Sequence, residues 1–275
     1  MPLMTLRHGT VSYTDSGDGP PVLALHANLH SSADYAAVAD DLSREHRLIT
    51  LDWPGHGDSP AVENPLTAEQ FGDLAVEFAD RLGVTNLAVV GNSVGGYAAC
   101  RIAIERPDRV AGLVLVNTGG FTPHSASSRA FCAVLGRPYV IRIVAPYFAR
   151  AYMRPQTAAD RAVIARVRAR SRTGAGARAG AALWRSFTEP AHDLRVAARA
   201  ITAPTLVTWG AKDPTAPVKW GRLVADAIPG ARFVTLPTGH VAFSSAPEAW
   251  LREVLPFLAQ VQASAERVDG PATGG

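Results

Sequence analysis

The chain has 275 residues, of which 47% are hydrophobic, and it carries a formal net charge of +3. This length and composition exclude a disordered or fibrous protein and are typical of a single α/β domain with a full buried core. No apolar segment of signal-peptide length opens the chain, and no apolar run reaches the roughly 20 residues that span a bilayer. We therefore expect a cytoplasmic protein without a membrane partner.

The predicted elements alternate between strands and helices along most of the chain. A small hairpin over residues 6–15 comes first. The strands predicted after it are Pro21–Ala27, His46–Asp52, Asn86–Asn92, Val110–Thr118, Thr205–Gly210 and Ala231–Pro237. The predicted helices are Thr67–Leu82, Val94–Arg106, Pro217–Ala227 and Ala246–Val261. Most strand runs are apolar without alternation, which predicts an α/β fold with a mostly parallel sheet and helices on both faces.

One basic segment, residues 122–203, interrupts this alternation before the last two strands. It holds 14 arginines, no lysine and three acidic residues. Its pattern predicts a helix over Ala158–Arg170 and a loop or hinge in the Gly/Ala-rich passage TGAGARAGAA. We expect residues 122–203 to form a helical cap on a core made of residues 1–121 and 204–262, followed by a flexible tail over residues 263–275.

Cysteine spacing and motifs indicate neither a metal ion nor a cofactor. Cys100 and Cys132 match no metal-binding or redox spacing, so we expect two buried free thiols. No dinucleotide-binding fingerprint is visible. The basic segment lacks a recognised nucleic-acid-binding motif, so the expected partner is a small-molecule substrate. The sequence does not indicate the oligomeric state.

The stretch VVGNSVGGYA places Ser93 between Gly91 and Gly95, at the junction of a predicted strand and a predicted helix. A strand that turns at once into a helix strains its junction residue and lifts that side chain to the carboxyl edge of the sheet. The N-terminus of the following helix directs its positive end to the same place. Gly-x-Ser-x-Gly alone is a weak signal, but in this context Ser93 is predicted to be a nucleophile.

A nucleophilic serine needs a base, and the base needs an orienting acid. His240, in LPTGHVAF, follows the last predicted strand, and Asp213, in TWGAKDPTAP, follows the strand before it. The structural alternatives are a loop histidine without a role and an aspartate that caps a turn. The end of the strand before the cap carries Asn117, which supplies no carboxylate.

The motifs LHAN, DWPGHGDS, GNSVGG, WGAKD and GHVAF occur in this order between residues 20 and 261. In this arrangement the chain resembles the cap-bearing α/β-hydrolase-fold enzymes. The family's order of nucleophile, acid and histidine selects Asp213 and His240 as the partners of Ser93. Earlier histidines also follow strand ends, and two earlier aspartates are interpreted as turn residues; these are His26, His30, His56, Asp52 and Asp58.

The resemblance also implies an oxyanion hole. In the family, a backbone N–H in the loop after the first central parallel strand joins the N–H that follows the nucleophile. These positions correspond to Asn28 and Val94 in this chain. The loop departs from the family pattern by having Ala27 where glycine is usual.

Ser93 separates this chain from the haloalkane dehalogenases and epoxide hydrolases of the fold, which carry aspartate at the nucleophile position. The motif GNSVGG around Ser93 is similar to the corresponding turn of carbon–carbon bond hydrolases that act on ring-fission diketo acids. After His240, however, Val241 stands where those enzymes usually have tryptophan. We therefore expect an esterase or lactonase first and a carbon–carbon bond hydrolase second. A non-hydrolytic receptor or scaffold is a third interpretation, and peroxidation, acyl transfer and cyclisation are compatible with the same three residues.

Two groups of side chains in the predicted cap, the arginines and the large apolar residues, can each be interpreted in two ways. The arginines are either a solvated surface or include one or two groups that bind an anionic substrate. The larger apolar and aromatic side chains form either the core of the cap or the wall of a substrate pocket. These side chains are Phe131, Tyr139, Phe148, Tyr152 and Trp184.

Overall fold

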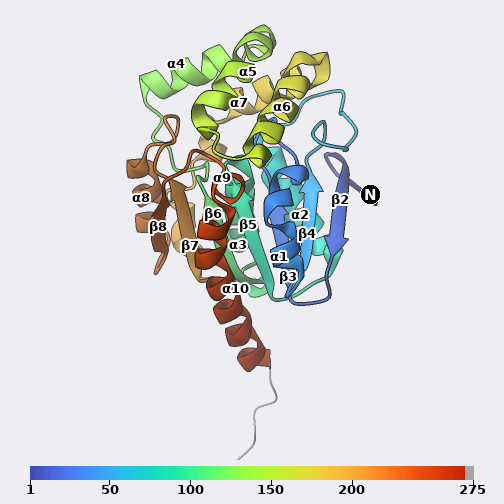
Figure 1. The fold of residues 1–275 in the computed structure, drawn as a ribbon, viewed down its shortest axis with the longest axis vertical. Helices are drawn as coiled ribbons and strands as arrows, with labels where there is room; N and C mark the ends of the chain where they lie inside the picture. Colours follow the sequence, from blue (N-terminus) through green and yellow to red (C-terminus); the bar gives the residue numbers. More distant parts are fainter. Residues whose placement is uncertain (270–275) are drawn as a thin grey trace, which may run out of the picture.

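The computed structural model describes residues 1–269, which contain an eight-stranded sheet with helices on both faces (Figure 1). The strand order is β1-β2-β4-β3-β5-β6-β7-β8, in which β2 pairs antiparallel with both β1 and β4 and all other pairs are parallel. The strands are β1 Leu3–Leu6, β2 Gly9–Ser16, β3 Pro21–Leu25, β4 Arg47–Asp52, β5 Leu87–Asn92, β6 Val110–Val116, β7 Thr205–Gly210 and β8 Arg232–Leu236. The predicted α/β fold and its mostly parallel sheet are confirmed.

The core helices connect the strands. They are α1 Ala39–Ser43, α2 Ala68–Leu82, α3 Val94–Glu105, α8 Val218–Ala227, α9 Ala242–Ser245 and α10 Pro247–Asp269, with 3-10 turns η1 Ser32–Ala37, η2 Pro107–Arg109, η3 Pro190–His192 and η4 Ala197–Ala200. Local chemistry sets the ends of α2. Thr67 and Gln70 cap its N-terminus reciprocally, and Gly83, with φ of 65°, ends it in the left-handed conformation.

Two apolar clusters cover the two faces of the sheet. Alternate residues of β3 belong to different clusters: Leu23 and Leu25 pack with residues of α2 and α3, whereas Val22 and Ala24 pack with residues of α10. Because both faces are buried, the strand must be apolar at every position. This explains why the strand runs do not alternate between apolar and polar residues.

The cap consists of four helices that lie over the carboxyl ends of the parallel strands (Figure 1). They are α4 Ala126–Leu135, α5 Pro138–Met153, α6 Ala158–Arg172 and α7 Gly174–Ser186. The expected loop in the Gly/Ala-rich passage is wrong, because that passage forms α7. Thr173 caps α7 by accepting a hydrogen bond from the N–H of Gly176, and small residues let the helix approach the core closely. A Cβ on Gly180 would lie 2.8 Å from Leu29 Cδ2.

The last helix is longer than the sequence predicts. Instead of ending at Val261, α10 continues to Asp269, so the expected flexible tail over residues 263–275 is helical as far as the structure describes it. Val261 and Gln262 are buried, and Val261 packs against Gly112 of β6. This contact holds the helix on the sheet at its predicted end. Residues 270–275 lie outside the described residues.

Among residues 1–269, no single helix is long and apolar enough to cross a membrane. The helices α4 and α5 meet the length and composition criteria only as a pair, and the chain bends by 101° between them.

Asp52 holds the turn that follows β4. One carboxylate oxygen accepts the N–H of Ser32 at 2.7 Å, and the other accepts the N–H of Asp58 at 2.8 Å. Asp52 is buried, whereas the Asp58 side chain is exposed. The buried carboxylate therefore joins two loops at the carboxyl edge of the sheet.

We predict that Asp52→Ala lowers the free energy of unfolding by about 3 kcal/mol, because two backbone donors lose a charged acceptor. Asp52→Asn, which keeps one carbonyl acceptor, should lose less. The matched control Asp58→Ala removes an exposed carboxylate and should stay within about 0.5 kcal/mol of the wild type. Urea denaturation of the three variants measures these differences, and equal losses for Asp52→Ala and Asp58→Ala would contradict the prediction.

Candidate active site

Ser93 occupies a strained turn between β5 and α3. Its φ is 58° and its ψ is −117°, a conformation that a residue with a side chain rarely adopts. The neighbours must be glycine: a Cβ on Gly91 would lie 2.4 Å from the carbonyl oxygen of Gly95, and a Cβ on Gly95 would lie 2.3 Å from that of Leu25. The chain therefore turns sharply because both flanking positions lack a side chain.

Backbone hydrogen bonds fasten this turn to its surroundings. The N–H of Ser93 donates to Val116 at the end of β6, and the Ser93 carbonyl accepts from Gly96 at 3.0 Å and from Gly119 at 2.8 Å. The adjacent Asn92 side chain donates to the carbonyl oxygens of Val116 and His240, at 2.9 and 3.0 Å. Asn92 thus ties the loop of the predicted base to the strand that carries the predicted nucleophile.

Asp213 and His240 are hydrogen-bonded to each other. The His240 Nδ1 atom lies 2.5 Å from Asp213 Oδ2, and the other carboxylate oxygen accepts from the N–H and the hydroxyl of Thr215. Burial raises the pKa of Asp213, but the His240 ring and these hydrogen bonds outweigh it and hold that pKa below its usual range. The carboxylate therefore stays ionised, keeps a proton on Nδ1 and leaves Nε2 free to accept one.

Asn117 is a site residue that the sequence analysis sets aside. It directly follows β6 with φ of 41°, donates from Nδ2 to Asp213 Oδ2 at 2.9 Å, and accepts the N–H of Gly210 through Oδ1 at 2.8 Å. The residue supplies no carboxylate of its own, but it orients that of Asp213 in the turn after β7. Its place at a strand end is the signal that could have identified it.

A cavity of about 830 Å³ lies between the core and the cap. Ser93, His240, Asn28 and Val94 line it, so the structure brings four of the five predicted site residues to one wall, with Asp213 behind His240. Four of the five large apolar cap side chains line the same cavity: Phe131, Phe148, Tyr152 and Trp184. Tyr139 does not line it and is 60% exposed.

The two predicted oxyanion donors lie in this cavity. The Asn28 side chain donates to the carbonyl of Gly180 in α7 at 3.2 Å, which fixes the loop against the cap. Leu29 follows with φ of 66°, and the N–H of His30 donates back to Ala27, so the loop forms a tight turn although Ala27 replaces glycine. Within the described part of the chain, no acceptor is found for the backbone N–H of Asn28 or of Val94.

The other histidines serve different surroundings. His26 accepts the N–H of Trp53 through Nε2 at 3.2 Å, and His56 packs edge-on against Phe71, so both stabilise the turn after β4. His192 lines the cavity, where it stacks on Phe187. The sequence analysis missed His192, because its position in the cap, away from any strand end, gives no signal.

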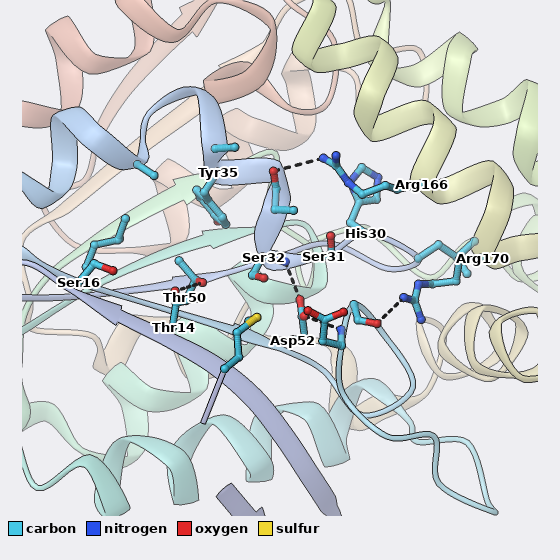
Figure 2. Close-up of a pocket in the computed structure, with 18 of the residues that line it drawn as sticks. Thr14, Ser16, His30, Ser31, Ser32, Tyr35, Thr50, Asp52, Arg166 and Arg170 are labelled. Atoms are coloured by element: carbon cyan, nitrogen blue, oxygen red, sulfur yellow. Dashed lines mark hydrogen bonds between the residues drawn. The ribbon is translucent and has the colours of Figure 1, made fainter. Parts of the chain in front are cut away.

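The arginines of the cap lie elsewhere. Among the described residues, none of those that line the cavity between core and cap is an arginine, and its lysine is Lys219 of α8. Arg166 pairs with Asp34 at 3.0 Å, and Arg170 donates to backbone carbonyls of the turn after β4. Figure 2 shows Arg166 beside His30, and Arg170 at the turn after β4, in a second, outer pocket of about 790 Å³. These two cap arginines therefore bind the core and do not reach into the cavity that Ser93 lines.

No group of three or more His, Cys, Asp or Glu side chains within residues 1–269 is arranged to hold a metal ion. Cys100 and Cys132 are buried free thiols, as the sequence predicts, and burial raises the pKa of Cys100 to about 12. Neither thiol is in the reactive thiolate form at neutral pH.

Comparison with known proteins agrees with this geometry. Residues 20–139 match the family model of the alpha/beta hydrolase fold. Haloalkane dehalogenase 2 of Mycobacterium tuberculosis is 31% identical over 218 residues, which cover 74% of this chain and 75% of that protein. The chain therefore belongs to the α/β-hydrolase fold family.

Two further relatives cover nearly the whole chain. Pimeloyl-acyl-carrier-protein methyl ester esterase of Nitrosomonas europaea is 27% identical over 86% of this chain and 94% of its own. The crystal structure of the enol-lactonase from Burkholderia xenovorans superimposes with a TM-score of 0.81 at 26% identity, covering 94% of this chain and all of that one. The similarity includes the cap as well as the core.

We predict that acid destabilises the protein below pH 6.5 through its buried histidines. Burial lowers the pKa of His26 and His192 to about 4 and that of His56 well below its usual range. Between about pH 6.5 and pH 4 the unfolded chain binds protons that the folded chain does not, so stability falls as pH falls, by at most about 1.4 kcal/mol per pH unit per histidine. Urea denaturation between pH 7 and 5 measures the slope. His192→Gln should reduce the slope, and an unchanged slope would contradict this origin.

Proposed function

We propose that the protein is a serine hydrolase that cleaves a small-molecule ester or lactone through an acyl-enzyme on Ser93. The observation that carries this proposal is the hydrogen-bonded pair of Asp213 and His240 at the cavity to which the strained turn presents Ser93. A strained serine, an oriented histidine and an ionised acid are the parts that nucleophilic acyl transfer needs.

The proposed mechanism assigns one task to each group. His240 Nε2 accepts the hydroxyl proton of Ser93 as the serine oxygen attacks the substrate carbonyl carbon. Asp213 stabilises the imidazolium, and the N–H groups of Asn28 and Val94 donate to the oxyanion. His240 then protonates the leaving alcohol as its bond to the carbonyl carbon breaks. In the second half, His240 deprotonates water, which attacks the acyl-enzyme, and the proton returns to Ser93 as the acid is released.

Among the chemistries of the family, ester or lactone hydrolysis suits this nucleophile. One of the sequence relatives is haloalkane dehalogenase 2, so dehalogenation is another reaction to consider. Ser93, however, stands where dehalogenases of this fold carry aspartate. The methyl ester esterase and the enol-lactonase support cleavage of a bond between an acyl carbon and oxygen.

The cavity wall indicates the kind of substrate. Aromatic side chains from three cap helices pack against one another there: the Phe131 and Trp184 rings meet edge-on at 5.5 Å, and Phe148 meets Trp184 at 6.1 Å. Such a wall favours an apolar acyl or aromatic group. If the substrate is anionic, Lys219 rather than an arginine is its cationic partner in this cavity.

We predict that a fluorophosphonate attaches once to the wild-type protein and not at all to Ser93→Ala. His240→Ala should slow attachment and ester turnover by at least about 10³-fold, because the serine loses its base. Intact mass spectrometry follows the adduct, and release of 4-nitrophenol from 4-nitrophenyl butyrate follows turnover. A folded Ser93→Ala protein that kept full turnover would overturn the assignment, and a single unrepeated turnover in wild type would favour a receptor.

We predict that Trp184→Ala raises KM for 4-nitrophenyl hexanoate more than for 4-nitrophenyl acetate, because only the longer chain reaches the aromatic wall. Loss of this apolar contact should cost about 1–2 kcal/mol of binding, or about 5- to 30-fold. The control is Tyr139→Ala, which removes an exposed cap aromatic outside the cavity. Equal changes in KM for both esters would place the acyl group elsewhere.

A further inference from the structure

The C-terminal end of cap helix α5 packs directly on the loop of His240. The N–H of His240 donates to the carbonyl oxygen of Tyr152 at 3.0 Å. The Tyr152 ring meets the His240 ring edge-on, with centroids 5.3 Å apart and an interplanar angle of 74°. Gly239 is in close contact with the same helix end, because a Cβ there would lie 2.2 Å from the carbonyl oxygen of Met153. A cap residue thus contacts both the backbone and the ring of the proposed base.

Tyr152 is itself held by a second aspartate–histidine pair, which the proposed mechanism does not use. The Tyr152 hydroxyl lies 2.7 Å from His30 Nε2, and His30 Nδ1 is hydrogen-bonded to Asp34. The other oxygen of Asp34 accepts from Arg166 of cap helix α6 at 3.0 Å. His30 and Asp34 are 1% and 3% exposed. His30 lines both the catalytic cavity and the outer pocket, where Figure 2 shows it beside Arg166.

The charges of the neighbouring groups indicate where the protons lie in this series of hydrogen bonds. Burial raises the pKa of Asp34, but His30 and Arg166 outweigh it, so the pKa lies below its usual range and the group accepts hydrogen bonds as a carboxylate. His30 therefore donates from Nδ1. Burial raises the pKa of Tyr152, and the charges of Asp34 and Asp213 raise it further, so its hydroxyl keeps its proton in the hydrogen bond with His30 Nε2.

We propose that Tyr152 is a positioning residue for His240 and that His30, Asp34 and Arg166 hold it in place. The inference rests on the proposed role of His240 as the base. Asp213 fixes the His240 ring through Nδ1, and Tyr152 supports the same ring from the cap. Displacement of α5 would release that support, so the cap is coupled to the base as well as enclosing the substrate.

The test compares Tyr152→Phe, which removes only the hydroxyl, with His30→Gln and with the control Tyr147→Phe. Tyr147 lies on the same helix and is 70% exposed. Loss of one buried hydrogen bond should lower kcat for 4-nitrophenyl butyrate and the rate of fluorophosphonate attachment by about 5- to 10-fold, with KM within about twofold. Tyr147→Phe should match the wild type. A role in stability alone would lower the melting temperature and leave both rates of the folded protein unchanged.

The double variant Tyr152→Phe/His30→Gln makes the test sharper. If both residues act through one hydrogen bond, the double variant should lose no more rate than the more affected single variant. If the rate losses of the two single variants multiply in the double variant, or if Tyr152→Phe is as fast as the wild type, the inference is overturned and the proposed function is left intact. A wild-type protein that takes up no fluorophosphonate would instead overturn the proposed function. If Tyr152→Phe does not fold, the variant Arg166→Gln tests the same series of hydrogen bonds, at a half-exposed position. It should lower both rates, and unchanged rates would overturn the inference.

Discussion

The site depends on one backbone constraint, the positive φ of Ser93 between β5 and α3. Such strain of about 1–3 kcal/mol persists only where the surroundings enforce it. Here the enforcement comes from glycines at both flanks and from hydrogen bonds that join the turn to the end of β6 and to the chain beyond it. The same turn points the serine into the cavity and leaves the N–H of Val94 at the start of α3 without an acceptor in the described chain. The proposed nucleophile and one proposed oxyanion donor therefore follow from a single local conformation.

The proposed base is held by groups from three directions. Asp213, oriented by Asn117 and Thr215, fixes one ring nitrogen; Asn92 fixes the backbone from the side of the nucleophile; and Tyr152 contacts both ring and backbone from the cap. A general base is effective only when it lies within hydrogen-bond distance of the proton that it accepts. Rigid support from separate elements therefore helps to keep the His240 ring in that position. The same contacts tie the loop of His240 to cap helix α5.

The sheet could be predicted from the sequence, and Ser93, Asp213 and His240 could be selected as candidates, because those features are local. Apolar strand runs, the Gly-Asn-Ser turn and the position of residues after strand ends each leave a pattern in a short stretch of chain. It failed where packing between distant segments decides the outcome. The glycines and alanines of α7 read as a loop, but they form a helix because small side chains let it pack against Leu29. Asn117 and His30 gain their roles from partners on other elements, and no local pattern encodes those partners.

Family membership leaves the substrate undecided, because dehalogenases, esterases and lactonases of this fold use the same frame. What differs among them is the nucleophile, which is one residue, and the wall of the cavity, which the cap supplies. In this chain the wall is aromatic, and those cap arginines whose partners are known pair with the core or with the cap itself. The concentration of positive charge in residues 122–203 is thus explained in part by attachment of the cap, through Arg166 and Arg170. Because Arg166 also ends the series of contacts that leads to Tyr152, one of the two arginines that fasten the cap also takes part in the proposed support of His240.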